Sequence, residues 1–242
     1  MILTISLLAV ALFAPLAANA LLGAGHSPEP WHRASMAPTG LAPDPLQSPE
    51  AIVQVYAAPA FDWRGIFAVH TWIVVKRADS MRYVRWDVMG WGGPPMVKRD
   101  YAAPDALWFG KQPHLLLDRR GEGVEALIER IEAAVRDYPY NDRYSTWPGP
   151  NSNTFVAHVA RQVPELRLDL PASALGKDYA PLPKMAMPAP SGTGLTLSLG
   201  GVLGATLAVE EGLELNLLGF GIGIDPLHPA LRLPGIGRFP RD

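Results

Sequence analysis

The fold is decided by the sequence FAVHTWIVVK at residues 67–76, which is followed by a turn at 78–80 and by YVRWDVM at residues 83–89. Both runs are rich in β-branched and aromatic residues and have the length of strands. Two such runs joined by a short polar turn are typical of a β-hairpin. Because the segment 52–56 also alternates in side-chain character and is rich in β-branched residues, the sequence predicts an antiparallel sheet with strands near 52–56, 67–76 and 82–89.

Two helices are predicted after these strands. From 121 to 138, apolar residues recur at every third or fourth position, as on the buried face of an amphipathic helix, and Pro139 ends the pattern. A second helix is expected over 151–162, between Pro150 and Pro164. We therefore expect residues 51–190 to form an α+β core domain, in which both helices pack on the antiparallel sheet.

The N-terminal part of the chain differs in composition from this core. Residues 1–25 contain no charged side chain, and the small residues Ala18 and Ala20 flank Asn19 as they would before a cleavage point. The segment therefore indicates a signal peptide or a membrane anchor, with a buried apolar helix of a soluble protein as the alternative. Residues 26–50 are punctuated by proline and are expected to be a linker.

Residues 191–242 are expected to be a glycine-rich β extension. The runs LTLSL at 195–199 and LELNL at 213–217 alternate strictly, and glycines and glutamates within this stretch argue against a membrane helix. The pattern predicts β-hairpins that either pack on the core or lie against a surface.

Composition excludes several classes of function. The chain has 21 basic and 23 acidic residues, so it lacks the positive excess of a general nucleic-acid binder. It has no cysteine, which excludes disulfides, zinc–thiolate sites, iron–sulfur clusters and a cysteine nucleophile. Its histidines are not spaced as metal ligands, so we expect neither a metal site nor a cofactor.

One constellation could carry chemistry. His70 lies inside an otherwise apolar strand, and a polar loop at 147–155 leads into the second helix. A nucleophile in the first turn of a helix has backbone N–H groups beside it that can bind an oxyanion. The candidate catalytic residues are Ser152 as nucleophile, His70 as base and Asp87 as the residue that orients the imidazole.

The same residues also have structural interpretations. Asn151 and Ser152 are preferred residues for the N-cap of a helix, and a lone strand histidine is often a hydrogen-bonded core or surface residue. We expect a groove between His70 and Ser152. Its candidate binding residues are Asn151, Asn153, Trp72 and Trp147.

The chain resembles the bacterial family catalogued as domain of unknown function 3750. The resemblance is carried by His70-Thr71-Trp72, by the loop 147–155 and by the tail 192–235, and it extends over about residues 40–237. The family name implies no established activity.

A second resemblance is to circularly permuted papain-like enzymes of the lecithin retinol acyltransferase type. These enzymes have an early strand histidine and, later in the chain, an Asn-Cys-x-x-Phe segment at the start of a helix. Asn151-Ser152-Asn153-Thr154-Phe155 is similar, with serine in place of the cysteine. A serine hydroxyl is far less acidic than a thiol and needs a general base to remove its proton.

Two functions follow from these observations. The first is a cell-envelope module, exported or tethered by its N-terminal segment, that binds a peptide, glycan or lipid without catalysis. The second is a serine-dependent hydrolase or acyltransferase that uses Ser152 and His70. In both cases we expect a membrane-anchored or periplasmic protein that interacts with the membrane through its N-terminal segment and does not bind nucleic acid.

Overall fold

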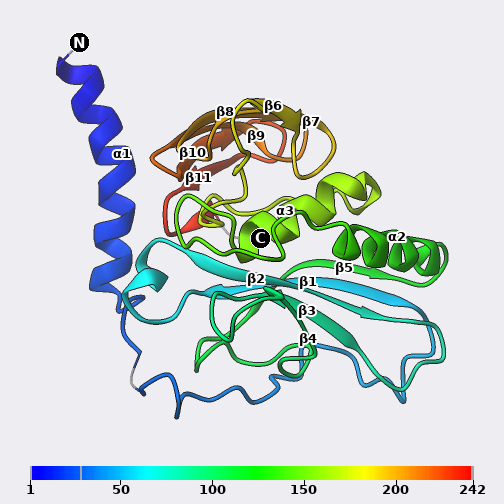
Figure 1. Cartoon of the computed structure of the whole chain (residues 1–242). Coiled ribbons are helices and arrows are strands. Elements are labelled where there is room, and N and C mark those ends of the chain that lie inside the picture. The colour runs from blue at the N-terminus through cyan, green and yellow to red at the C-terminus, as the bar shows by residue number, and fades with distance from the viewer. Residues whose placement is uncertain (1, 28, 241–242) are drawn as a thin grey trace.

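The chain folds into two antiparallel sheets with helices between them, and a long N-terminal helix stands at one edge (Figure 1). The computed structural model describes residues 2–27 and 29–240, apart from the side chains at 2–5, 7 and 8. The α+β class with antiparallel strands is therefore confirmed.

The first sheet has five strands in the order β4-β3-β2-β1-β5, and every neighbouring pair is antiparallel. Its three central strands fall on the three segments that the sequence predicts. Strand β1 is buried at seven of its eight positions, because both faces of the sheet are covered. The strands are β1 (Ile52–Pro59), β2 (Val69–Lys76), β3 (Val84–Val88), β4 (Val97–Arg99) and β5 (His114–Arg120).

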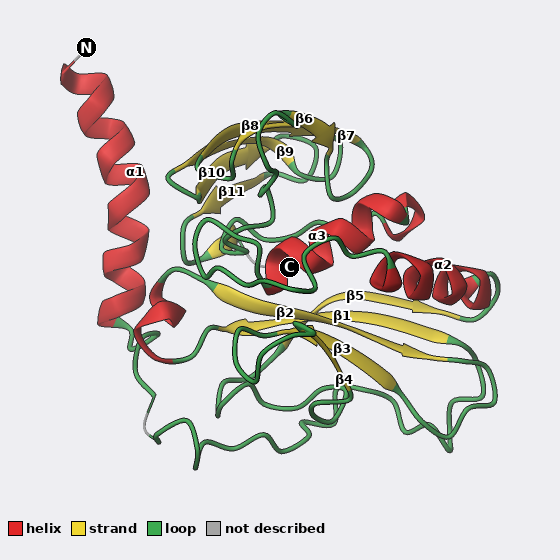
Figure 2. Ribbon diagram, in the orientation of Figure 1, coloured by secondary structure: helices red, strands yellow, loops and turns green. Residues whose placement is uncertain are grey.

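Two helices cover one face of this sheet, as the periodicity predicts (Figure 2). They are α2 (Val124–Arg136) and α3 (Ser152–Gln162). Helix α2 begins after Gly123, whose φ of 77° suits a residue without a side chain. Val53 and Val75 from the strands pack in one buried cluster with Ile128 of α2 and Val159 of α3, and this cluster is the main core. A short 3-10 turn, η2 (Pro164–Leu166), follows α3.

The other face of the first sheet holds a smaller aromatic core. Tyr56, Trp72 and Trp108 belong to one buried cluster there. The proline-rich segment 26–50 and the loop 100–113 cover this cluster and are hydrogen-bonded to each other, for example from Leu107 N to Ala37 O at 2.9 Å. The segment expected to be a linker therefore packs on the domain.

The second sheet has seven strands in consecutive order, β12-β11-β10-β9-β8-β7-β6, and is antiparallel throughout. The alternating runs of the sequence form β7 and β9, and the sheet continues to residue 239. Its strands are β6 (Ala186–Pro188), β7 (Gly194–Leu199), β8 (Leu203–Ala208), β9 (Gly212–Leu217), β10 (Phe220–Asp225), β11 (Ala230–Leu233) and β12 (Gly237–Phe239).

The N-terminal segment forms one helix, α1 (Ile2–Leu21), which continues through Pro15. It contacts β10, β11 and the short 3-10 helix η1 (Asp62–Ile66). The side chain of Asn19 fixes its C-terminal end by donating hydrogen bonds to Ile66 O at 2.9 Å and Gly235 O at 2.8 Å. Among the residues that are described, no helix is both long enough and apolar enough to cross a membrane.

Candidate functional site

The centre of the first sheet contains a buried histidine–aspartate pair. His70 on β2 and Asp87 on β3 lie on neighbouring strands, and the imidazole Nε2 is 2.9 Å from Asp87 Oδ1. Arg85, two residues before Asp87, donates to both oxygens of the same carboxylate, from Nε at 2.7 Å and from Nη2 at 2.8 Å. The structure thus brings together two of the three residues predicted to be catalytic and adds a guanidinium that the sequence analysis had not assigned.

Burial sets the protonation of this cluster. Desolvation lowers the pKa of the His70 imidazole, and the neighbouring Asp87 carboxylate only partly opposes this shift. Burial alone would raise the pKa of the Asp87 carboxyl, but hydrogen bonds from His70 and Arg85 hold it below its usual value. At neutral pH, His70 is therefore neutral, Asp87 is ionised, and the charge of Asp87 is balanced by Arg85.

Aromatic rings enclose the cluster. The imidazole of His70 stacks on Trp108 with ring centres 3.6 Å apart and planes 4° from parallel. The guanidinium of Arg85 lies 4.2 Å from the ring centre of Trp72, in a cation–π contact. Trp72 in turn donates from Nε1 to Pro104 O at 2.8 Å. All three side chains of the charged cluster are less than one-tenth exposed, so little of the imidazole is open to a ligand.

Ser152 lies on the opposite side of the sheet from His70. His70 and Thr71 are consecutive in β2, so their side chains point to opposite faces. Thr71 points toward α3, since its Oγ1 donates to Asn153 Oδ1 at 2.9 Å and to the backbone O of Ser152 at 3.4 Å. His70 belongs to the face covered by Trp108. The structure therefore does not bring Ser152 and His70 together, because strand β2 runs between them.

The asparagines of the predicted groove hold the start of α3 in place. The Oδ1 of Asn151 accepts from the backbone N–H groups of Asn153 and Thr154, and the Thr154 hydroxyl accepts from the Asn151 N–H, which completes a capping box. The Asn151 amide also donates to Thr146 O and Leu175 O. Asn153 donates to Leu175 O and to Val69 O on β2. Both amides are thus occupied by the protein's own backbone.

The two tryptophans predicted to bind a ligand also lie apart. Trp72 is fully buried beside His70. Trp147 is 48% exposed and donates from Nε1 to Leu218 O at 2.9 Å, which ties the loop before α3 to the second sheet. The four predicted binding residues therefore do not line a common groove.

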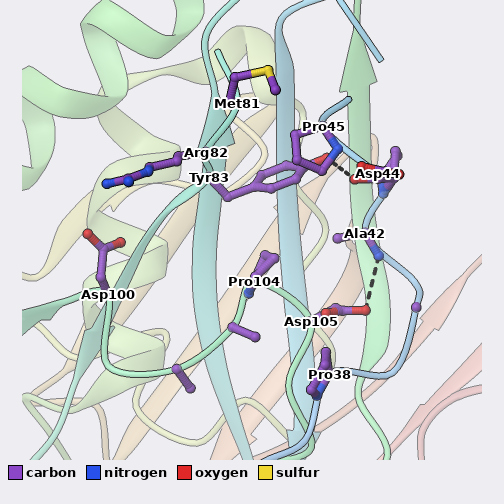
Figure 3. Close-up of a pocket in the computed structure, with 14 residues that line it drawn as sticks. Pro38, Ala42, Asp44, Pro45, Met81, Arg82, Tyr83, Asp100, Pro104 and Asp105 are labelled. Carbon is purple, nitrogen blue, oxygen red and sulfur yellow. Dashed lines mark hydrogen bonds between the residues drawn. The ribbon is translucent and has the colours of Figure 1, made fainter. Parts of the chain in front are cut away.

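A cavity of about 550 Å³ lies elsewhere, between the proline-rich segment and β3 (Figure 3). Its lining is largely proline and alanine, with Tyr83, Arg82 and three aspartates. Asp105 is turned inward to the backbone, accepting from Leu41 N at 2.6 Å and Ala42 N at 3.2 Å. No local sequence pattern reveals this cavity, because its walls come from segments about 40 and 60 residues apart in the chain.

A second feature that the sequence analysis missed is a buried network of charges under the second sheet. Arg232 on β11 donates to Glu214 on β9 at 2.7 Å and forms two bonds to Asp169 at 2.6 and 2.8 Å. Lys177 lies 2.7 Å from Glu214 and 2.8 Å from Asp178. Burial alone would raise the pKa of Glu214, but Lys177 and Arg232 hold it below its usual value. Within the described residues, no group of three or more His, Asp or Glu is placed to hold a metal ion.

Comparison with known proteins identifies a family for the region that contains these residues. Searches of curated proteins and of solved structures found no match to the chain. A family model matches a region that begins two residues before β1 and ends in the loop between η2 and β6, so the region includes the His70–Asp87 pair and the Asn151 turn. This model, described as "Protein of unknown function (DUF3750)", matches residues 50–179, more than half of the chain, and the chain therefore belongs to this family.

Proposed function

We propose that this chain is a non-catalytic binding module of the cell envelope, held at a membrane by its N-terminal segment. The main support for a non-catalytic role is that the first sheet separates His70 from Ser152. A serine hydroxyl needs a base within hydrogen-bond reach, directly or through one water. Here the imidazole is bonded to Asp87 and stacked on Trp108, so the hydrolase alternative loses His70 as the base for Ser152.

The N-terminal helix supports the membrane half of the proposal. Residues 1–25 have no charged side chain, and Val10 and Phe13 are each about 60% exposed on α1. Exposed apolar side chains on a charge-free helix favour a lipid environment over water. The two bonds donated by Asn19 join the helix to the domain, and we take them as support for its retention as an anchor over cleavage after Ala20. We place the domain on the extracytoplasmic side.

The cavity beside β3 is our candidate for the binding place. Its volume is within the range of about 300–1,000 Å³ that is common for ligand sites. The three carboxylates in the cavity accept hydrogen bonds from the protein's own backbone. Asp44 and Asp105 accept from N–H groups of the proline-rich segment, and Asp100 accepts from Arg85 N. The remaining surface of proline, alanine and Tyr83, with Arg82 at its edge, suits a peptide segment better than a glycan.

Charge substitution in α1 tests the tether. The full chain carrying Val10→Arg and Phe13→Arg should be released from membranes by an alkaline carbonate wash, whereas the wild type should stay bound, because a charge in the apolar layer costs about 2–3 kcal/mol. Leu22→Arg is the control, since Leu22 is 85% exposed just beyond the helix. Thermal unfolding would verify that all three chains are folded. Release of the wild type, or retention of the doubly charged chain, would overturn the tether.

A further inference from the structure

The second sheet has its polarity reversed. Each outward position of β7, β8 and β9 is leucine or, at 205, alanine, whereas the alternate positions that face the domain are polar or glycine, except for Ala208 at the end of β8. We call the outward side chains of these strands the leucine face; its most prominent members are Leu195, Leu197, Leu199, Leu207, Leu213 and Leu215, each 44–69% exposed. A sheet packed on a domain in water normally shows the opposite alternation, apolar inward and polar outward.

The polar inner side fixes this orientation. Thr196 and Thr206 share a hydrogen bond at 2.9 Å, and Glu214 is held by Arg232 and Lys177 in the buried network. A shift of one residue in register would turn every side chain to the other face and would expose or break these pairs. The inner polar pairs thus fix the orientation of the sheet in which the leucine side chains point outward.

The leucine face is part of a wide, exposed apolar surface. Seven strands spaced about 4.8 Å apart make the sheet roughly 30 Å wide. The apolar character continues across β10 to β12, where Ile224, Leu231 and Phe239 are each about half exposed. Exposed apolar patches beyond a few hundred Å² mark contact surfaces.

The face adjoins the charge-free helix α1. Helix α1 contacts β10 and β11, and Asn19 is bonded to Gly235, between β11 and β12. Figure 1 shows α1 standing upright beside this sheet, with its N-terminal end extending beyond it on the side away from the first sheet. Helix α1 therefore lies beside the same sheet that carries the leucine face, next to β10 and β11.

The chemistry of the face favours lipid over a protein partner. Protein interfaces retain a large polar fraction and are enriched in tyrosine, tryptophan and arginine. The outward positions of β7, β8 and β9 carry none of these residues, no charge and no hydrogen-bonding side chain. Such a surface matches the hydrocarbon layer of a bilayer, because neither of them carries charges or hydrogen-bonding groups. We propose that the leucine face lies on a lipid bilayer and enters its apolar layer; this rests on the membrane tether of the proposed function and extends it to the whole second sheet.

A fluorescent label on the face tests the proposal in the full chain. Because the chain has no native cysteine, Leu207→Cys can carry a single environment-sensitive dye. The matched control is Met81→Cys, 57% exposed beside the cavity at the first sheet. Both chains are reconstituted into phosphatidylcholine and phosphatidylglycerol vesicles, with or without nitroxide-labelled lipid. We expect the nitroxide to quench the label at 207 several-fold more than the label at 81.

A substitution next to the label sharpens this test. Leu213 pairs directly with Leu207 across the two strands, so Leu213→Lys should lower the docked fraction about tenfold and restore fluorescence at 207, whereas Leu213→Met should not. A chain that floats with the vesicles but has an unquenched label at 207 would overturn this proposal and leave the tether intact. A chain that does not float would overturn both. An unquenched label together with disulfide-linked pairs of unlabelled Leu207→Cys chains would instead assign the face to a second copy.

Discussion

The imidazole Nε2 of His70 lies 2.9 Å from Oδ1 of Asp87, on the face of the first sheet that turns away from Ser152. The contact joins two neighbouring strands and is completed by Arg85, which neutralises the carboxylate. A histidine that is bonded, stacked and almost fully buried stabilises the sheet. This arrangement leaves the residues predicted to be catalytic in two separate structural networks.

The first prediction concerns covalent labelling. We expect a fluorophosphonate probe to label neither the wild type nor Ser152→Ala, because the His70 imidazole lies on the other face of the sheet and cannot take the proton of the serine hydroxyl. Gel fluorescence of both proteins beside an active serine hydrolase measures this. Labelling of the wild type that disappears in Ser152→Ala would restore the hydrolase hypothesis.

The second prediction is a pH dependence of stability due to His70. Since its pKa is lowered in the folded state, the unfolded chain binds a proton that the folded chain resists, so the stability is present above about pH 6.5 and declines as the pH falls below it. In His70→Gln, the slope of the free energy of unfolding between about pH 7.5 and 5.5 should be smaller by up to about 1.4 kcal/mol per pH unit. Urea unfolding in mild detergent measures both chains.

His158 contributes to the same dependence, because burial also lowers its pKa. It is present in both chains, so it cancels in the comparison. Equal slopes in the wild type and in His70→Gln would mean that folding leaves the pKa of the His70 imidazole unchanged, which contradicts its burial.

The third prediction separates the roles of two neighbouring residues in the turn before α3. Asn151→Ala should lower the free energy of unfolding by about 1–3 kcal/mol, because it removes the helix cap and leaves the Leu175 and Thr146 carbonyls without this donor. Ser152→Ala should cost less, since in Ser152 the backbone carbonyl, which the substitution preserves, is the group that contacts Thr71. A larger loss for Ser152→Ala would contradict the capping role of Asn151.

The fourth prediction concerns the charges under the second sheet. Arg232→Met should destabilise the protein by about 3–5 kcal/mol, because Glu214 and Asp169 would lose their shared buried partner. The matched control is Arg167→Met, which breaks the partly exposed pair with Glu210 and should cost no more than about 1 kcal/mol. Similar losses in the two variants would show that the buried network does not hold the sheet.

The sequence predicted most of the first sheet and both of its helices. Runs of β-branched residues located β1, β2 and β3, and the helical periodicity located α2, because in both cases one face or both must be buried. The contact between His70 and Asp87 could also be expected, since a hairpin places neighbouring strands side by side. The sequence did not predict that His70 and Ser152 lie on opposite faces of the sheet. No local pattern distinguishes the face toward which His70 points from the face that α3 covers.

The second sheet illustrates the same limit. Strict alternation at 195–199 and 213–217 predicted strands, but periodicity does not state which set of side chains is buried. The answer depends on Arg232 and Lys177, which lie far along the chain and pair with Glu214 only in the folded protein. For the same reason, the cavity beside Tyr83 could not be found from sequence.

Photo-cross-linking tests most directly whether the reversed sheet and α1 face lipid. The unmodified full chain is cross-linked by a phospholipid that carries a photoactivatable group in its acyl chain, and the modified residues are located by peptide mapping. We expect cross-links in α1 and at the leucines of residues 195–217, with none at residues 81–105 around the cavity. Cross-links confined to α1 or to the cavity side, with residues 195–217 unmodified, would contradict the account.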